Sequence, residues 1–552
     1  MSYISLQNVT YNYPLQKIKA LNNITLNIDK GEIVFILGKS GSGKSTLARC
    51  LTGAIPYFYG GDISGEILIN NKSIRNFTHK ERAKEITMVF QDPERQLVMD
   101  KVHREIAFSL ENIGVCDKEI KRRVWETMTF FNISHLWNRE VVSLSGGEKQ
   151  KVVIASAVAL KPNCIVLDEP ISQLDPQSAE EVIYFIKKIN EELGITIIII
   201  EQRIDKWFDI SDRILMIDNG KIKFIGNKEE FYKENSYNFL PSYLKVNKLL
   251  GEKSYKSIKD TRKIINKLNY KNTKNVLQEN TSDNKNKFSL KNIFKKQVEE
   301  KYLIKLRNIS VKKEDKTILS DINLNFKGST FYTIMGENGA GKSTLLKTLM
   351  GLIDFKGDIY LKEKSIKNLK RKEIAKLIGY VSQNPNDYIS KDTVEEEIKF
   401  TLSNFGINDD KSVDDILNEL NITSLKYMNP RDVSGGEKQR IAIASIMVMK
   451  PKIIILDEPT RGLDNVTKER LGEFLKSLVK SGSTVIMVTH DMDFTSEYSD
   501  EIILMFNGKI IAKDYKEKIL KDGIYYTSIV HNLFKDKYPN VFSIKDFKNL
   551  LK

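Results

Sequence analysis

The feature that most constrains this fold is a set of three motifs that occurs twice, in the same order. Residues 38–46 (GKSGSGKST) and 336–344 (GENGAGKST) both fit the pattern G-x-x-x-x-G-K-[ST]. Each is followed by SGGEKQ, which starts at Ser145 and at Ser434, and then by LDEP, which starts at Leu167 and at Leu456. The spacing between the two later motifs is the same in both copies. The chain is therefore an internal repeat of two similarly built halves.

The segments around each glycine-rich loop predict a strand, the loop and then a helix. The apolar stretches GEIVFILG and STFYTIMG lead into the loops, and TLARCLTG and TLLKTLMG follow them. The runs CIVLDEP, TIIIIEQ, IIILDEP and TVIMVTH lack alternation, which is typical of parallel strands buried on both faces. Alternating segments at the start of each half, ISLQNVTYNY and LIKLRNISV, indicate antiparallel strands. We therefore expect two tandem α/β nucleotide-binding domains, each with an antiparallel β subdomain.

Composition divides the chain into a first domain (1–230), a linker (231–300) and a second domain (301–552). More than half of the net charge of +15 falls in the linker, which is also rich in asparagine. Such a segment predicts a solvated connector; a nucleic-acid-binding arm and a patch that faces anionic lipid are the alternatives. Helical spacing in LPSYLKVNKLL and SIKDTRKIINKL predicts short helices within it. We expect the tail, 514–552, to be helical and to pack on the second domain.

Other features exclude some classes of protein. Cys50, Cys116 and Cys164 lie far apart in the sequence, which favours free thiols in a reducing compartment over disulfides or a metal site. The opening MSYISLQNVT does not resemble a secretory signal. The longest apolar run, residues 195–200, is much shorter than the ~20 residues that span a bilayer. A membrane role would therefore have to act through a partner.

The repeated loops have the chemistry that binds a nucleoside triphosphate. Backbone amides in a glycine-rich loop surround phosphate oxygens, a lysine approaches the β and γ groups, and a hydroxyl helps to hold Mg²⁺. Lys44 and Lys342 supply the charge, and Ser45 and Ser343 supply the hydroxyl. The remaining expected loop contacts are Gly38, Ser40, Gly41, Gly43 and Thr46 in the first half, and Gly336, Asn338, Gly339, Gly341 and Thr344 in the second.

The two acids of LDEP have separable roles. Asp168 and Asp457 end buried strands, where we expect each to hold Mg²⁺. Glu169 and Glu458 lie one residue further on, where a carboxylate can orient and deprotonate the attacking water. The sequence thus predicts two sites for hydrolysis of ATP.

SGGEKQ between a phosphate loop and LDEP resembles the signature of ATP-binding cassette (ABC) ATPases. The resemblance covers both halves but not the linker or about the last forty residues. It implies a helical signature subdomain in each half, and two domains that close head to tail over two ATP molecules. Ser434, Gly435 and Gly436 would then complete the site of Lys44, while Ser145, Gly146 and Gly147 would complete the site of Lys342.

Within this family the chain resembles the energy-coupling factor (ECF) type importers, which take up vitamins and transition-metal ions. Gln91 in VFQDPERQ and Gln383 in VSQNPNDY match the family's glutamine loop. The resemblance implies that these glutamines touch Mg²⁺ and that their loops contact the membrane partner. It further implies an integral-membrane coupling protein, a separate substrate-binding membrane subunit and a position at the cytoplasmic face of the membrane.

The two copies differ at two positions that matter for the chemistry. His490 matches the family's switch histidine, whereas Gln202 occupies that place in the first half. Tyr13 lies where the family places an adenine-stacking aromatic residue, whereas the second half has Lys313. We expect the Lys342 site to hydrolyse ATP faster and the Lys44 site to retain nucleotide longer; the alternative is that glutamine substitutes adequately and both sites are equally fast.

Two other functions compete with the importer ATPase. Ribosome-binding ABC proteins also carry two cassettes on one chain, but they resemble LDEPTNHLD where this chain has LDEPISQLD and LDEPTRGLD. Double-cassette sugar importers usually have weakened motifs in the second half, and here that half is the fuller one. We therefore expect an importer ATPase that meets the membrane only through its partners and binds no nucleic acid.

Overall fold

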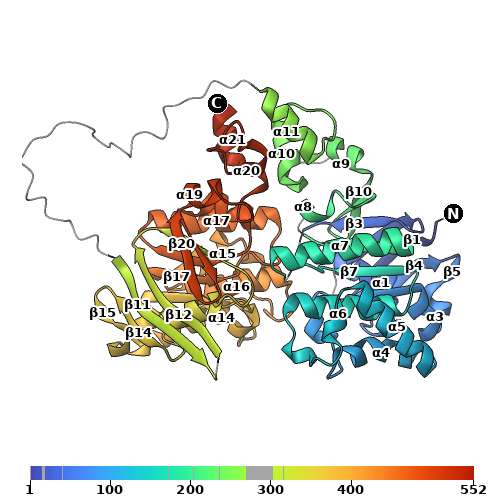
Figure 1. Ribbon diagram of the computed structural model, residues 1–552, viewed down its shortest axis with the longest axis horizontal. Coiled ribbons are helices and arrows are strands. Elements are labelled where there is room, and N and C mark those ends of the chain that lie inside the picture. Colours follow the sequence, from blue (N-terminus) through green and yellow to red (C-terminus); the bar gives the residue numbers. More distant parts are fainter. Residues whose placement is uncertain are drawn as a thin grey trace, which may run out of the picture.

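The two halves of the chain have the same topology and lie side by side (Figure 1). The computed structural model describes residues 2–14, 19–39, 41–172, 174–202, 204–234, 237–268, 302–314 and 316–551. The second part of the expected linker, from residue 269 to 300, lies outside this range, as does Ser40. Each half contains one four-stranded and one six-stranded sheet.

In each half, the strands that open the domain form an antiparallel sheet with the order β2-β1-β4-β5 or β12-β11-β14-β15. Alternating apolar residues along these strands are buried on one face, as the sequence pattern predicts. The strands are β1 (Ile4–Asn12), β2 (Leu21–Ile28), β4 (Asp62–Ile69) and β5 (Lys72–Ser73), and β11 (Tyr302–Lys313), β12 (Lys316–Lys327), β14 (Lys356–Leu361) and β15 (Lys364–Ser365).

The six-stranded sheets form the centre of each half and have equivalent strand orders, β6-β7-β8-β3-β9-β10 and β16-β17-β18-β13-β19-β20. Their first five strands are parallel and the last is antiparallel. The strands are β3 (Ile33–Leu37), β6 (Ile86–Val89), β7 (Cys164–Asp168), β8 (Thr196–Ile200), β9 (Arg213–Asp218) and β10 (Lys221–Gly226), and β13 (Phe331–Met335), β16 (Ile378–Val381), β17 (Ile453–Asp457), β18 (Thr484–Val488), β19 (Glu501–Phe506) and β20 (Lys509–Tyr515).

Both faces of these sheets are covered, which explains the continuous apolar runs in the sequence. In β8, Ile197 and Ile199 pack into one core cluster, while Ile198 and Ile200 pack into another on the opposite face. The covering helices of the first half are α1 (Lys44–Leu51), α2 (Ala54–Tyr57), α3 (His79–Glu85), α4 (Val102–Asn112), α5 (Asp117–Phe130), α6 (Gly146–Ala159), α7 (Pro176–Leu193), α8 (Ile204–Trp207) and α9 (Lys228–Glu234).

The helices of the second half repeat this arrangement and continue into the tail. They are α12 (Lys342–Leu349), α13 (Arg371–Leu377), α14 (Val394–Asn404), α15 (Asp410–Glu419), α16 (Gly435–Met447), α17 (Asn465–Lys480), α18 (Met492–Tyr498) and α19 (Lys516–Lys521). In both halves the signature helix, α6 or α16, lies against α4 and α5 or α14 and α15, which together form the helical subdomain. The expected α/β fold with antiparallel and helical subdomains is confirmed.

Two helices at the start of the expected linker pack against two helices of the tail (Figure 1). The first pair is α10 (Ser242–Leu249) and α11 (Ile258–Lys267), which occupy the stretches where apolar spacing predicts helices. The second pair is α20 (Ile529–Phe534) and α21 (Ile544–Leu551). Tyr243 and Ile265 share a buried cluster with Phe534 and Phe547. Residues 237–268 are thus a packed helical extension of the first half.

The expectation that the tail packs on the second domain is therefore only partly correct. Phe542 joins a small cluster with Met335 and Ile502 of the second half, but α20 and α21 bury their apolar faces against α10 and α11. These faces come together because each helix alone is too short to be stable without a buried contact.

A short sequence repeat marks this pairing. Residues 257–260 and 543–546 both read SIKD and begin α11 and α21. In both, the serine hydroxyl accepts a hydrogen bond from the aspartate amide, at 3.2 Å for Ser257 and for Ser543. The serine therefore caps each helix in the same way, and the internal repeat extends into both helical pairs.

The packing of the tail on α10 and α11 predicts a large effect of Phe534→Ala. The Phe534 ring is fully buried and lies 4.6 Å from the ring of Phe547, centroid to centroid. Its removal leaves a cavity that costs about 3–5 kcal/mol, so the melting temperature of the full chain should fall. Tyr515→Ala removes a largely exposed ring and is the control. Equal melting temperatures of the two variants would contradict this packing.

Candidate nucleotide-binding sites

The two phosphate loops have nearly identical conformations. Lys44 Nζ donates hydrogen bonds to the carbonyl oxygens of Gly38 and Lys39, at 2.8 and 2.7 Å. Lys342 Nζ makes the equivalent bonds to Gly336 and Glu337, at 2.7 and 2.8 Å. Both ammonium groups are thus held over the mouth of their own loop, where a phosphate would offer better acceptors than two carbonyls.

The loops depend on glycine at the residue before each helix. Gly43 has a φ of +103°, and an added Cβ would lie 2.6 Å from the carbonyl oxygen of Ala20. Gly341 has the same left-handed conformation. The amides of α1 and α12 therefore point into the loops, and Thr46 and Thr344 lie in the first turn of these helices, next to Ser45 and Ser343. Gly41, Gly339 and Asn338 are exposed at the loop tips.

Carboxylates from both halves surround the loop lysines. Burial lowers the pKa of Lys44, whereas the charges of Glu169 and Asp168, and of Asp464 from the second half, act in the opposite direction. Burial also lowers the pKa of Lys342, and there the opposing charges include Asp175 from the first half. Each lysine therefore lies within electrostatic range of an aspartate from the other half.

The aspartates of LDEP end β7 and β17 beside the loop serines. Ser45 Oγ donates to Asp168 Oδ1 at 3.2 Å, and Ser343 makes the corresponding hydrogen bond to Asp457. Burial, followed by the charge of Glu169, raises the pKa of Asp168 to about 6. Burial likewise raises the pKa of Asp457, whose Oδ1 is buried without a hydrogen-bond partner among the described residues. A hard cation would satisfy these oxygen donors.

Glu169 and Glu458 have an unusual backbone conformation that the sequence did not reveal. Their φ angles are +47° and +52°, in the left-handed region that side chains rarely occupy. The amide of Glu169 donates to Ile200 O at 2.7 Å, and that of Glu458 to Val488 O at 2.9 Å. The adjacent strand thus fixes each glutamate just beyond its own strand, a strained arrangement typical of functional positions.

The surroundings of the two glutamates differ. In the first half, Gln91 Nε2 donates to Glu169 Oε2 at 2.6 Å, and Gln202 Nε2 donates to Glu169 Oε1 at 2.8 Å. Both carboxylate oxygens of Glu169 therefore accept a hydrogen bond from a side-chain amide. In the second half, His490 Nε2 lies 3.4 Å from Glu458 Oε1. Gln383 is exposed at the end of β16.

Tyr13 and Lys313, which differ between the two halves, also have different surroundings in the structure. Tyr13 is half-buried; its hydroxyl lies 3.1 Å from Thr46 Oγ1 and accepts a hydrogen bond from Arg49 at 2.8 Å. Lys313 is exposed at the end of β11. An aromatic surface therefore borders the first loop where an exposed lysine stands at the equivalent position of the second half.

The signature motifs begin α6 and α16 with the same cap. Ser145 N donates to Glu148 at 2.8 Å and Ser434 N donates to Glu437 at 2.9 Å, as in a capping box. Ser145 and Gly146 are exposed, and Ser434 is half-buried beside exposed Gly435. Gly147 and Gly436 are buried, and a Cβ on Gly147 would lie 2.6 Å from Ser178 Oγ. The second glycine therefore permits the close approach of α7.

Residues from both halves meet at the first site. A small pocket there is lined by Leu37 and Gly38 of the loop, by Glu201 and Gln202, and by Asp464, Asn465 and Val466 of the second half. Asp175 and Asp464 are the residues that sequence reasoning missed, although both end the L-D pair that follows LDEP in each half. They cap α7 and α17. Each lies within electrostatic range of the loop lysine of the other half, Asp175 of Lys342 and Asp464 of Lys44.

Among the residues that the structure describes, no helix combines the length and apolar character needed to span a bilayer.

Comparison with known proteins identifies the family. The family model described as ABC transporter matches residues 21–172 and 319–461. A predicted ABC transporter ATP-binding protein of Clostridium tetani is 43% identical over 82% of this chain and 100% of its own length. One from Bacillus cereus is 33% identical over 99% of this chain and 97% of its own. One from Clostridium perfringens is 36% identical over 94% of this chain and 92% of its own length.

Among solved structures, cbiO1 from Clostridium perfringens, described as part of the ABC transporter complex cbiONQ, is 32% identical. The match covers 45% of this chain and 96% of the cbiO1 chain, with a TM-score of 0.40. The family match and the full-length relatives carry the assignment: the chain belongs to the ABC transporter ATP-binding proteins and is an ATPase with two ABC cassettes.

Proposed function

We propose that this ATPase is the motor subunit of an ECF-type importer, which drives uptake of a vitamin or metal ion through separate membrane subunits. The observation that carries the proposal is the 2.6 Å contact between Gln91 and Glu169. It joins a loop that borders a surface groove to the residue that we propose as the catalytic base. A partner that moves this loop can therefore change the reactivity of the ATP site.

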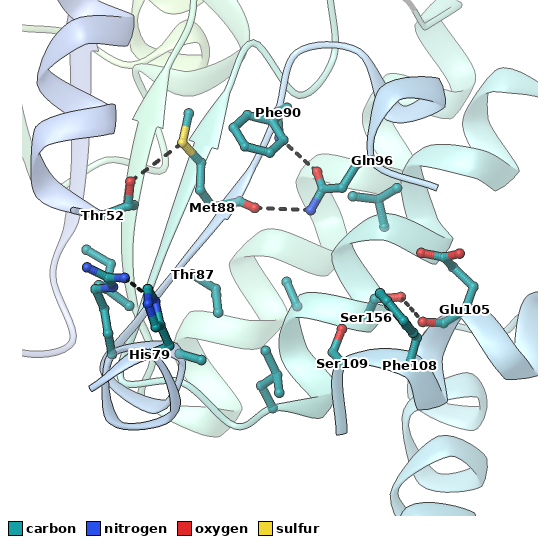
Figure 2. Close-up of a pocket in the computed structure, with 16 residues that line it drawn as sticks. Thr52, His79, Thr87, Met88, Phe90, Gln96, Glu105, Phe108, Ser109 and Ser156 are labelled. Carbon is teal, nitrogen blue, oxygen red and sulfur yellow. Dashed lines mark hydrogen bonds between the residues drawn. The ribbon is translucent and has the colours of Figure 1, made fainter. Parts of the chain in front are cut away.

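The groove lies between the central sheet and the helical subdomain of the first half (Figure 2). Its cavity measures about 400 Å³. The walls come from β6 and α3 on one side and from α4 and α6 on the other, and combine aromatic, aliphatic and polar groups: Thr52, His79, Arg82, Ala83, Ile86, Thr87, Met88, Phe90, Gln96, Glu105, Phe108, Ser109, Val153, Ser156, Ala157 and Leu160. We propose that a cytoplasmic segment of the membrane partner docks here.

Side-chain hydrogen bonds connect the groove wall to the glutamine loop. Gln96 accepts from Phe90 N at 3.0 Å and donates to Met88 O at 3.2 Å (Figure 2). In the second half, the hydroxyl of Tyr388 makes the same pair of bonds, accepting from Ser382 N at 2.8 Å and donating to Tyr380 O at 3.0 Å. Each bridge binds the backbone amide of the residue just before Gln91 or Gln383. Displacement of the wall would therefore move these glutamines.

Within each site, the residues have distinct proposed roles. Lys44 and Lys342 neutralise the β and γ phosphates and the loop amides bind their oxygens. The donor set of each site fits Mg²⁺: Ser45, Asp168 and Gln91 would hold it in the first, and Ser343, Asp457 and Gln383 in the second. When bound, the ion would neutralise charge that develops on the phosphates. Glu169 and Glu458 orient and deprotonate the attacking water.

We propose that both sites are shared between the halves. The charge of Asp464 opposes the lowering of the Lys44 pKa, and the charge of Asp175 does the same for Lys342. Each half thus contributes an aspartate to the surroundings of the other half's lysine, which supports shared sites. Burial lowers the pKa of Lys438 in the second signature, and the charge of Arg95 in the first half lowers it further. These two residues of different halves therefore lie within electrostatic range of each other. In this arrangement Ser434, Gly435 and Gly436 complete the Lys44 site, and Ser145, Gly146 and Gly147 complete the Lys342 site.

We further propose that the two sites work at different rates. Two amides occupy both oxygens of Glu169, and an amide neither carries a positive charge nor shuttles a proton. His490 can do both next to Glu458. Tyr13 adds an aromatic surface for adenine at the first site. The Lys342 site is thus the faster one, and the Lys44 site holds nucleotide longer.

Separate substitutions of the two glutamates test this asymmetry. Glu458→Gln should reduce steady-state ATP hydrolysis by about 10²-fold or more, because it removes the base of the faster site. Glu169→Gln should cause a much smaller loss. Glu111→Gln, at an exposed position, is the control. Equal losses of hydrolysis and of transport for the two glutamates would refute the asymmetry.

Isolation of the chain with its partners tests the importer itself. Purification in mild detergent should recover a stoichiometric integral-membrane protein, and Ala157→Arg in the groove should reduce this recovery because it places a charge inside the docking site. Lys223→Glu, on the exposed face of β10, should not. Co-sedimentation with ribosomes, with no membrane protein recovered, would favour the ribosome-binding class instead.

A further inference from the structure

A serine at the start of α10 links one aspartate from each half. Ser242 N donates to Asp205 Oδ1 at 2.6 Å, and Ser242 Oγ donates to Asp493 Oδ2 at 2.7 Å. The two aspartates hold equivalent positions, each three residues after Gln202 or His490. They belong to α8 and α18, the helices that follow the loops carrying these two site residues. One residue of the helical extension therefore connects corresponding points of both halves.

Several charged side chains among the described residues surround this contact. Lys245 of α10 faces both aspartates. Lys468 of α17 is also close to Asp205, but it is paired with Asp491 at 2.7 Å. Asp491, at the start of α18, adds a third negative charge near the pair. Among the residues that the structure describes, three carboxylates thus lie near two ammonium groups.

Protonation of one carboxyl group relieves this imbalance. Burial, and then the charge of Asp205, raises the pKa of Asp493 to about 7; burial also raises the pKa of Asp205. Two carboxylates that share a site cannot both ionise without repulsion. The contact binds a proton that the separated aspartates would release at their ordinary pKa of about 3.9.

We propose that Asp205, Asp493 and Ser242 form a proton-dependent link between the two halves, which holds the loops carrying Gln202 and His490 in a fixed relative position. The three are positioning residues, since they lie behind the site residues and not among the groups that surround the phosphates. The link couples the two ATP sites, because a shift of α8 or α18 at one site is passed through Ser242 to the other.

The stability of this contact depends on pH because its closed and open states bind different numbers of protons. Because the closed contact has the raised pKa, it binds more protons than the open one between about pH 4 and 7. The stability of the contact is therefore greatest at low pH and falls as the pH rises to about 7. Above that pH it stays constant. A rise of one pH unit within this window shifts the opening equilibrium by up to about tenfold.

Hydrogen exchange of the full chain between pH 5 and 8 measures this equilibrium directly. After correction for the intrinsic pH dependence of exchange, amides of α8, α10 and α18 in the wild type should open increasingly up to about pH 7. Asp493→Asn keeps an acceptor for Ser242 Oγ but removes the charge, so opening should become nearly independent of pH and should be lower than in the wild type at pH 8. Its ATPase rate should lose only the part of the pH dependence that follows this opening.

Two further variants separate the link from general damage to the fold. Ser242→Ala should increase opening at every pH but keep the wild-type slope, since both carboxyl groups remain. Asp522→Asn, at an exposed position of the tail, should match the wild type. An unchanged slope in Asp493→Asn would overturn the proposal, as would the same flattening in Asp522→Asn.

Discussion

The structure depends on charged side chains held at the ends of buried parallel strands. β7 and β17 end in an aspartate and are followed by a glutamate, and β3 and β13 lead into the phosphate loops. β8 and β18 lie between them in the sheets and are followed by Gln202 and His490. Because the carboxyl ends of parallel strands meet at one edge, these groups converge there. The cost of burying the carboxylates is offset by Lys44 and Lys342 and by the loop serines.

The same edge explains why one residue can make the two sites unequal. In both halves a backbone hydrogen bond to the neighbouring strand holds the main chain of the glutamate at the same place. The amide of Gln202 donates to one oxygen of Glu169, whereas the imidazole of His490 lies beside Glu458; an imidazole can take up a proton and an amide cannot. The backbone arrangement is therefore the same in both halves, whereas the side chains beside the glutamate differ.

Motifs in the sequence predicted the duplicated α/β fold, the phosphate loops and the position of the LDEP acids after buried strands, because strand–loop–helix order and buried apolar runs are local signals. Three features required coordinates. The positive φ of Glu169 and Glu458 is not encoded by residue type, and the bonds of Gln91 and Gln202 to Glu169 are long-range contacts. The packing of the tail was predicted only in part, because the SIKD repeat that begins both α11 and α21 is too short to stand out.

Trapping of nucleotide with vanadate tests the central claim of two unequal sites most directly. Vanadate with ADP mimics the transferring phosphate, so a photoreactive ATP analogue would become trapped at the site that reaches the hydrolytic state. The account predicts that labelled peptides come predominantly from the Lys342 site when trapping follows turnover. Equal labelling of the loops at Lys44 and Lys342, or predominant labelling at Lys44, would contradict it.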